Sequence, residues 1–155
     1  MRTLFALVLL SLLLSACGAG GIGGGLPTPV VSVNTAPSPE SAAAAYLEAW
    51  NAGNYTVMYD LLSASSKAAI TVEDFVARYA MVATQTNLFR VDYEILSSLT
   101  NPADAQVGYR VTLNSSVIGP ITRDTSMGLQ LEGNQWRVVW ADSIILPELA
   151  GGNTL

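Results

Sequence analysis

The sequence has no histidine, a single cysteine and a single lysine, and these shortages exclude several kinds of active site. Without histidine the chain cannot assemble a Ser-His-Asp triad, a Cys-His pair or a zinc site of the ordinary type. One cysteine cannot close a disulfide within the chain. Charged residues make up only 12% of the chain, and 7 basic against 12 acidic side chains give a net charge of −5. Because an acidic chain repels the phosphates of nucleic acid, we expect no nucleic-acid partner. We also expect no metal and no cofactor.

The N-terminus carries the longest apolar run. After Met1-Arg2-Thr3, all but one of residues 4–14 are apolar. A run of this length is too short for a stable membrane-spanning helix and is typical of the core of a signal peptide. The sequence Leu14-Ser15-Ala16-Cys17 follows at once and resembles the bacterial lipoprotein signal, in which the chain is cleaved before the cysteine and the thiol receives a lipid. We therefore expect residues 1–16 to be a signal peptide and Cys17 to be lipidated; a plain secretory signal and a retained single-pass anchor are the alternatives.

Residues 17–37 are rich first in glycine and then in proline and small polar residues, a composition that cannot bury a core. We interpret this segment as a tether, with an r.m.s. span on the order of 25 Å if it is fully flexible. Tether and lipid together predict a domain that lies outside the cytoplasm, anchored at the outer face of the cytoplasmic membrane.

The first half of the remaining chain has the apolar period of helices. Residues 38–40 combine a capping serine, a proline suited to the first helical position and an acid near the positive end of the helix dipole. A second, shorter helix is predicted over residues 54–63, and a third over residues 71–87 from its capping box. The alanine- and serine-rich stretch 64–70 is predicted as a connector. The first helix has apolar residues at the i, i+3, i+4, i+7 spacing of one face, namely Ala43, Tyr46, Leu47 and Trp50.

From residue 88 onward the apolar period changes to two, which is typical of strands with one buried face. Turns are predicted at Asn101-Pro102 and Gly119-Pro120, and Gly128 is interpreted as a bulge or bend. Gly133-Asn134 tolerates positive φ and predicts a tight hairpin between the last two strands. The inward residues are then Phe89, Val91, Tyr93 and Ile95 in the first strand, Val107, Tyr109, Val111 and Leu113 in the second, and Leu129, Leu131, Trp136, Val138 and Trp140 in the last hairpin.

The order of elements predicts the fold class. We expect an α+β domain over residues 38–149, in which three N-terminal helices pack on one face of a curved four-stranded antiparallel sheet. Residues 150–155 are interpreted as a tail or as the start of a linker that continues elsewhere.

Three stretches carry a resemblance to a known family. They are the first helix with Trp50 and its Asn-x-Gly-Asn-Tyr turn, residues 71–79 (TVEDFVARY) and residues 136–149 (WRVVWADSIILPEL). These are similar to the nuclear-transport-factor-2-like (NTF2-like) N-terminal domain of class B penicillin-binding transpeptidases, which precedes the catalytic domain in methicillin-resistance transpeptidases. The resemblance covers residues 38–149. It departs from the family at residues 140–143, where Trp-Ala-Asp-Ser stands in place of the common Trp-Asp-Pro-Ser.

The resemblance implies a conical domain that acts as a non-catalytic spacer or scaffold in cell-wall (peptidoglycan) synthesis and the response to β-lactam antibiotics. In the family the chain continues from such a domain into the penicillin-binding domain, so we expect either a stand-alone domain or a truncated transpeptidase. Ile144, Ile145 and Leu149 form an apolar cluster at this exit, and Pro147 interrupts any regular element there. We expect this cluster to mediate self-association or the docking of a partner, such as a transpeptidase domain or another cell-wall protein.

Transpeptidases of this class use the motifs Ser-x-x-Lys, Ser-x-Asn and Lys-Thr-Gly. Lys67 is the only lysine, and Ala64 rather than serine stands three residues before it. We therefore expect no reaction with penicillin and no enzyme activity.

Two other functions remain open for a conical fold. One is a lipoprotein that binds a small ligand in the cone, and the other is an isomerase or dehydratase with an aspartate base and tyrosine donors. Asp60 is the candidate base, and Arg123 could reach a carboxylate at the mouth of the cone. The candidate donors are Tyr46, Tyr93 and Tyr109. A closed, aromatic-filled cone would favour the spacer, whereas an open pocket with an inward carboxylate would favour the other two functions.

Overall fold

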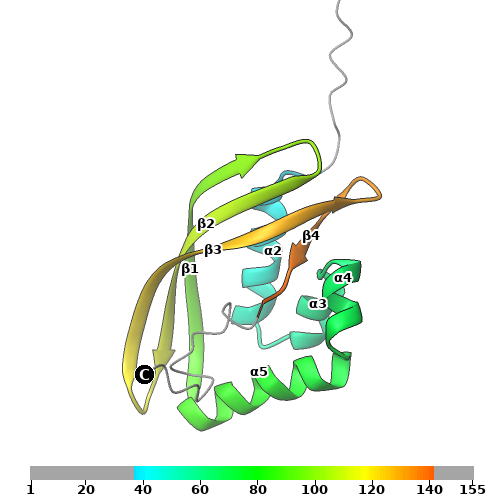
Figure 1. Cartoon of the computed structure of the whole chain (residues 1–155). Coiled ribbons are helices and arrows are strands. Elements are labelled where there is room, and N and C mark those ends of the chain that lie inside the picture. Colours follow the sequence, from blue (N-terminus) through cyan, green and yellow to red (C-terminus); the bar gives the residue numbers. More distant parts are fainter. Residues whose placement is uncertain (1–36, 142–155) are drawn as a thin grey trace, which may run out of the picture. The chain divides into compact units, whose positions relative to one another are not determined.

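The computed structural model describes residues 37–141 of the chain. Within this range four helices are followed by four strands (Figure 1). The fold is therefore α+β with a four-stranded antiparallel sheet, as the sequence predicts. None of the helices in this range is long and apolar enough to cross a membrane. The helices are α2 (Pro39–Asn51), α3 (Tyr55–Asp60), α4 (Ala64–Ala69) and α5 (Val72–Thr86), and the strands are β1 (Leu88–Thr100), β2 (Asp104–Ser115), β3 (Gly119–Glu132) and β4 (Gln135–Val139).

Helix α2 begins as its sequence predicts. The Ser38 side chain accepts a hydrogen bond from the Ser41 backbone N–H at 3.2 Å, and Pro39 occupies the first helical position. After the helix, Gly53 has a φ of +66°, which lets the chain reverse without steric strain. The predicted inner face, Ala43, Tyr46, Leu47 and Trp50, is buried.

The segment after α2 differs from the prediction. Helix α3 ends at Asp60, so the expected helix over residues 54–63 is too long, and the expected connector contains the short helix α4. The chain leaves α3 because β4 supplies hydrogen-bond partners: Leu61 C=O accepts from Val138 N–H at 3.0 Å, and Ser63 N–H donates to Val138 C=O at 2.8 Å. Ser63 then caps α4. This short helix has no apolar period because its buried residue is Ser66.

Helix α5 runs from a Thr71 cap to Asn87, as predicted. Thr71 Oγ accepts from Asp74 N–H at 3.1 Å and donates to the Asp74 carboxylate at 2.8 Å. Asn87 stops the helix in the left-handed region with a φ of 48°. The buried residues of this helix are Phe75, Tyr79 and Val82.

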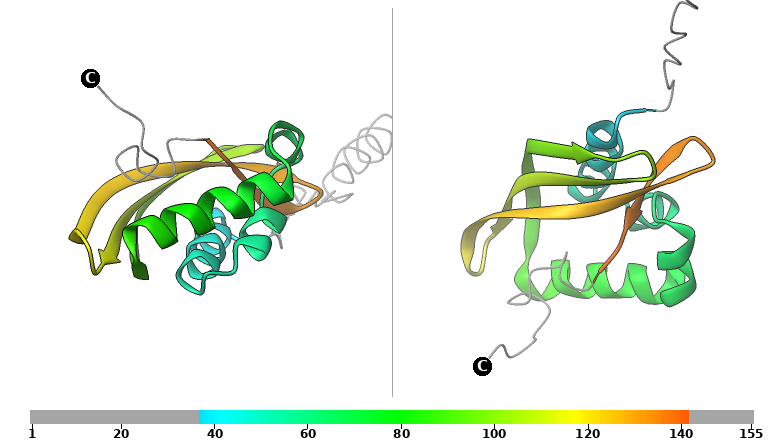
Figure 2. Two further views of the ribbon diagram at one scale, coloured as in Figure 1. Left: turned by 90° about the horizontal axis from the view of Figure 1, so that it is seen from below. Right: turned by 45° about the horizontal axis from the view of Figure 1, so that its top comes forward.

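The strands follow one another in the order β1-β2-β3-β4, and the sheet curves so that α2, α3 and α5 lie on one of its faces (Figure 2). Two predictions about this sheet are wrong. Phe89 does not share the inner face with Val91, because the β1–β2 register shifts between Leu88 and Arg90 and leaves Phe89 68% exposed. Gly128 marks no bulge, since its strand pairs without interruption on both sides; the second shift lies in β1, between residues 95 and 97.

The predicted turn at Gly119-Pro120 is displaced, since the turn occupies residues 116–118 and Gly119 already opens β3. The last hairpin is confirmed. Gly133 and Asn134 have φ values of 53° and 68°, as a tight two-residue turn requires. Leu129 pairs with Val138 and Leu131 with Trp136, so the predicted residues of β3 and β4 share one face.

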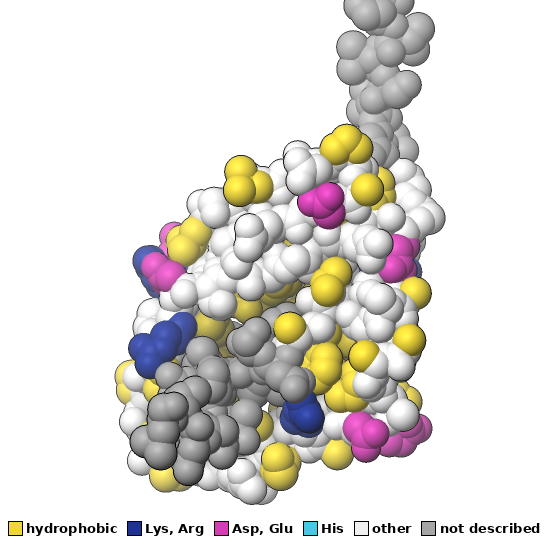
Figure 3. Space-filling model, viewed as in Figure 1, with side chains coloured by type: hydrophobic (Ala, Val, Ile, Leu, Met, Phe, Trp, Pro, Cys, Tyr) yellow, Lys and Arg dark blue, Asp and Glu magenta, His cyan; other side chains and the backbone are white. Residues whose placement is uncertain are grey.

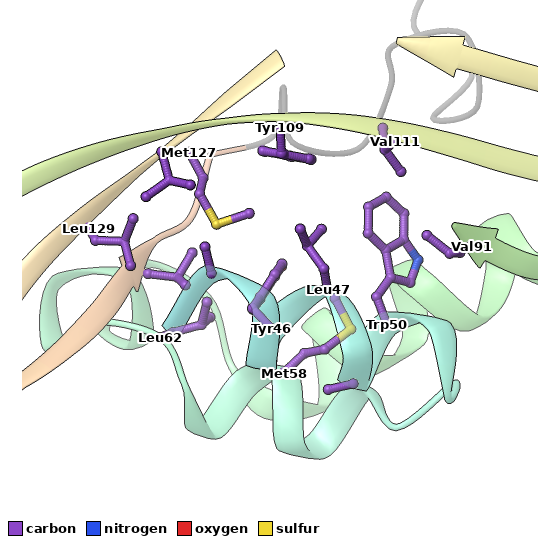
Figure 4. Packing of buried hydrophobic residues seen from close by; sticks show 14 of the residues in the cluster. Tyr46, Leu47, Trp50, Met58, Leu62, Val91, Tyr109, Val111, Met127 and Leu129 are labelled. Carbon is purple, nitrogen blue, oxygen red and sulfur yellow. The ribbon is translucent and has the colours of Figure 1, made fainter. Parts of the chain in front are cut away.

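The core lies between α2 and the sheet (Figure 4). Tyr46, Leu47 and Trp50 of α2 point toward Tyr109 and Val111 of β2. All four predicted inward residues of β2 are at most 2% exposed, so the alternating pattern of that strand is confirmed. The apolar face of α2 packs against the sheet and fills the interior of the domain.

Candidate functional site

Three tyrosines from three elements lie in the interior of the domain. Tyr46 of α2 and Tyr79 of α5 are buried, and their hydroxyl oxygens lie 2.8 Å apart in a hydrogen bond. Tyr109 of β2 is buried as well, and among the described residues its hydroxyl has no hydrogen-bond partner. Burial raises the pKa of the Tyr46 and Tyr109 phenols, so both hydroxyls are neutral in ordinary conditions.

Aromatic rings fill the space around these hydroxyls. The Tyr79 ring lies 4.7 Å from Phe75, 5.6 Å from Trp50 and 5.7 Å from Tyr55, measured between centroids. The Trp50 contact is edge-on and the Tyr55 contact is stacked, both favourable geometries for aromatic pairs. The sequence analysis did not identify Tyr79 as the centre of this cluster. The i, i+4 spacing of Phe75 and Tyr79 was the available signal.

The other candidate residues of the cone lie at the surface. Asp60 is exposed at the end of α3, where its backbone carbonyl accepts from Lys67 Nζ at 2.9 Å and from Arg137 at 3.0 Å. Tyr93 is half-buried, and its hydroxyl donates to the Glu48 carboxylate at 3.4 Å; burial raises its pKa. Arg123 is exposed on β3.

The structure thus brings Tyr46 and Tyr109 together in the interior but separates both from the candidate base Asp60. The proposed acid–base set does not share one pocket. Cys17, Ile144, Ile145 and Leu149 lie outside the described residues.

The outer face of the sheet is polar. Arg110 donates two hydrogen bonds to the Asp124 carboxylate, at 2.8 and 2.9 Å, and a third to Glu94 at 3.2 Å. The hydrogen bonds and charge of Asp124 raise the pKa of Arg110. Thr112 and Thr122 pair their hydroxyls across neighbouring strands at 2.9 Å. A face of this kind is suited to water rather than to a buried contact.

A hollow of about 660 Å³ opens beside Trp140, and we call it the Trp140 hollow. The Trp140 backbone N–H donates to Ser66 Oγ at 2.9 Å, and its ring meets the Phe75 ring edge-on at 5.8 Å. The Arg78 guanidinium stands over the same ring, 5.4 Å from its centroid. Figure 3 shows hydrophobic side chains at the surface between the sheet and the helices, and scattered charged side chains elsewhere on the same face. The hollow is lined by Lys67, Ala68, Ala69, Ile70, Thr71, Asp74, Arg78 and Trp140.

Comparisons with known proteins bear on the family of this chain. Among curated proteins, penicillin-binding protein 3 of Bacillus subtilis (strain 168) is 26% identical over 134 residues, which cover 81% of this chain and 20% of that protein. The chain therefore spans about a fifth of the length of this relative.

Solved structures share the fold. A hypothetical protein with a ketosteroid isomerase-like fold from Catenulispora acidiphila, determined in complex with trimethylamine, matches with a TM-score of 0.51 and 15% identity over 74% of this chain and 95% of that chain. A SEC-C motif containing protein from Rhodopseudomonas palustris matches with a TM-score of 0.53 and 9% identity, over 66% of this chain and 76% of that one. At these identities the likeness concerns the fold alone. The model of the NTF2-like N-terminal transpeptidase domain matches residues 38–153, most of the chain, and the chain therefore belongs to this family.

Proposed function

We propose that this chain is a non-catalytic spacer or scaffold domain of the cell-wall transpeptidase system. A lipid on Cys17 would anchor it at the outer face of the cytoplasmic membrane, and the glycine- and proline-rich residues 17–37 would hold the domain away from the bilayer. Its relation to the N-terminal domain of penicillin-binding proteins supports this role.

The observation that carries the proposal is the closed interior of the domain. A binding protein or enzyme of conical shape needs an inward polar group that a solute can reach. Tyr46 and Tyr109 are 0% exposed and sit among packed side chains, so solvent does not reach their hydroxyls. The Asp60 side chain is exposed at the end of α3 and is not part of the interior. A filled interior supports a scaffold over a ligand-binding lipoprotein or an isomerase.

The proposed partner is a transpeptidase, either as a further domain of the same chain or as a separate protein. The match to one fifth of penicillin-binding protein 3 supports this choice, because the name of that relative states that it binds penicillin. A role in the response to β-lactam antibiotics follows from the same relation and is part of the proposal. Because this sequence lacks the serine–lysine motif, the acylated nucleophile in this proposal would belong to the partner.

Photo-crosslinking in intact cells tests the proposal. A photo-reactive amino acid placed at Phe89, Val117 or Leu99, three exposed apolar positions, should join the chain to a protein that a fluorescent penicillin labels. The matched control carries the same amino acid at buried Val107 and should give no such product. The chain itself should carry no label. A stoichiometric penicillin adduct on the chain, or crosslinks from all three positions that never include a penicillin-labelled protein, would contradict the proposal.

A further inference from the structure

The chain leaves the sheet at Trp140, beside the Trp140 hollow. The last pair of the β3–β4 ladder joins Gly128 to Val139, so the ladder ends one residue before Trp140. A residue beyond the last pair of a ladder is prone to fray, because the sheet no longer holds its backbone. Trp140 nevertheless contacts two helices that lie far away in the sequence. We call Trp140 and Ala141 the sheet exit.

Helix α4 holds the backbone of the sheet exit through two buried serines. Trp140 N–H donates to Ser66 Oγ at 2.9 Å, and Ser66 Oγ lies 2.8 Å from Ser63 Oγ in a second hydrogen bond. The two serines are at most 5% exposed. Ser63 caps the helix, but Ser66 lies within it, where alanine is more favourable than serine. The buried hydroxyl of Ser66 is therefore explained by its bond to Trp140 rather than by the helix.

Helix α5 holds the side chain of the same residue. The Trp140 ring meets the Phe75 ring edge-on, with 5.8 Å between the centroids, and the Arg78 guanidinium lies 5.4 Å from the centroid of the indole ring. Both arrangements are favourable for an aromatic ring. Phe75 is fully buried and belongs to the core, so its contact joins the indole to the interior of the domain.

Helix α4 is itself joined to the sheet at its first turn. Ser63 N–H donates to the Val138 carbonyl of β4 at 2.8 Å. Ala64 N–H donates to both oxygens of the Glu132 carboxylate of β3, at 3.0 and 3.2 Å. Two strands thus fix the helix that carries Ser66. A movement of the sheet exit relative to the sheet requires that the contacts with α4 and α5 break.

We propose that Ser66, Phe75 and Arg78 are positioning residues that hold the sheet exit in one place and one direction on the domain. Ser66 holds the backbone, and the two side chains of α5 hold the indole ring. The inference rests on the proposed spacer function and deepens it. A spacer that sets the place of a following domain or of a bound partner needs an exit that does not swing, and contacts with two helices supply this property.

A distance measurement between two spin labels on the full chain tests the proposal. Labels on Ala141→Cys and Gln85→Cys, in a chain with Cys17→Ser, report the place of the sheet exit relative to α5. Without further changes this chain should give one narrow distribution of distances. Ser66→Ala should broaden it and should make the Trp140 backbone amide exchange about tenfold faster or more, while core amides of β2 keep their protection. Alanine favours the helix, so α4 itself is not weakened.

Two further variants complete the test. Trp140→Leu removes the ring contacts with Phe75 and Arg78 but keeps the backbone bond to Ser66, and it should also broaden the distribution. The matched control is Ser65→Ala, which removes an exposed hydroxyl of the same helix that bonds to Ser63 instead of Trp140. This control should change neither the distribution nor the exchange rate.

Three results would overturn the proposal. The first is a broad distribution in the labelled chain without further changes, and the second is a narrow distribution that both Ser66→Ala and Trp140→Leu retain. The third is faster exchange of core amides together with the Trp140 amide, which would mean a general loss of stability instead of a released exit. None of these measurements involves penicillin or the lipid, so each of these results would leave the proposed spacer role standing.

Discussion

At the scale of single residues, the Tyr109 hydroxyl stands out because burial has removed it from water and no described residue replaces the lost hydrogen bond. Tyr46 and Tyr79, by contrast, form a hydrogen bond with each other in the core. An enzyme would use such hydroxyls as donors toward a substrate. Here they sit at the centre of a packed aromatic cluster, and their raised pKa values keep them neutral.

This difference between paired and unpaired hydroxyls leads to a prediction. Tyr109→Phe should leave the free energy of unfolding unchanged or raise it by up to about 1 kcal/mol, because it removes an unpaired buried polar atom. Tyr46→Phe should lower it by about 1 to 2 kcal/mol, because it removes the buried hydrogen bond between the Tyr46 and Tyr79 hydroxyls. Urea unfolding of both variants measures the two effects. A larger loss in Tyr109→Phe than in Tyr46→Phe would mean that Tyr109 has a partner, such as a buried water molecule.

At the scale of elements, the final hairpin shows how far sequence patterns reach. Its two-residue turn and its shared inner face were predictable because positive φ at Gly133-Asn134 and strict alternation are local properties. The start of α2 and both ends of α5 were predictable for the same reason, since caps depend on neighbouring residues. The hydrogen bonds between β4 and residues 61–63, which end α3 early, were not predictable because they join segments that lie far apart in the sequence.

The candidate site was less predictable than the fold. Periodicity placed Tyr46 and Tyr109 on inner faces, and the structure agrees. It could not say that Asp60 would lie outside, since this residue ends a short helix whose length is set by contact with the sheet. The prediction that Phe89 faces inward was wrong for a related reason. A single register shift reverses the faces of a strand, and the local sequence does not indicate where such a shift occurs.

The β4 register makes a prediction about two neighbouring residues. Trp136 is 7% exposed and faces the core, so Trp136→Ala should lower the free energy of unfolding by about 3 to 5 kcal/mol. Arg137 faces the other way and donates to the Asp60 carbonyl, so Arg137→Ala should cost about 1 kcal/mol or less. Chemical denaturation compares them directly. Similar losses in the two variants would mean that the two faces of β4 are assigned the wrong way round.

At the scale of the molecule, the two faces of the sheet differ in burial and polarity. One face is buried under the helices and supplies the stability of the fold. The other carries exposed ion pairs such as Arg110 with Asp124, which add little stability but keep the surface compatible with water. Because the interior is filled, any interaction must involve the surface of the domain or the segments that flank it. Of these segments, the N-terminal one carries the lipoprotein-like sequence that ends at Cys17.

Cys17→Ser should therefore release the protein from the membrane fraction, because the lipid is the proposed attachment and no helix of residues 37–141 is able to span a bilayer. The variant should also fail to incorporate labelled fatty acid. Thr28→Ser, a matched hydroxyl exchange within the tether, should leave both attachment and labelling unchanged. Ultracentrifugation of cell lysates followed by immunoblotting measures the distribution. If Cys17→Ser stays wholly in the membrane fraction with its first 16 residues uncleaved, the apolar N-terminal run is itself the anchor, and the spacer would be held by a transmembrane segment instead of a lipid.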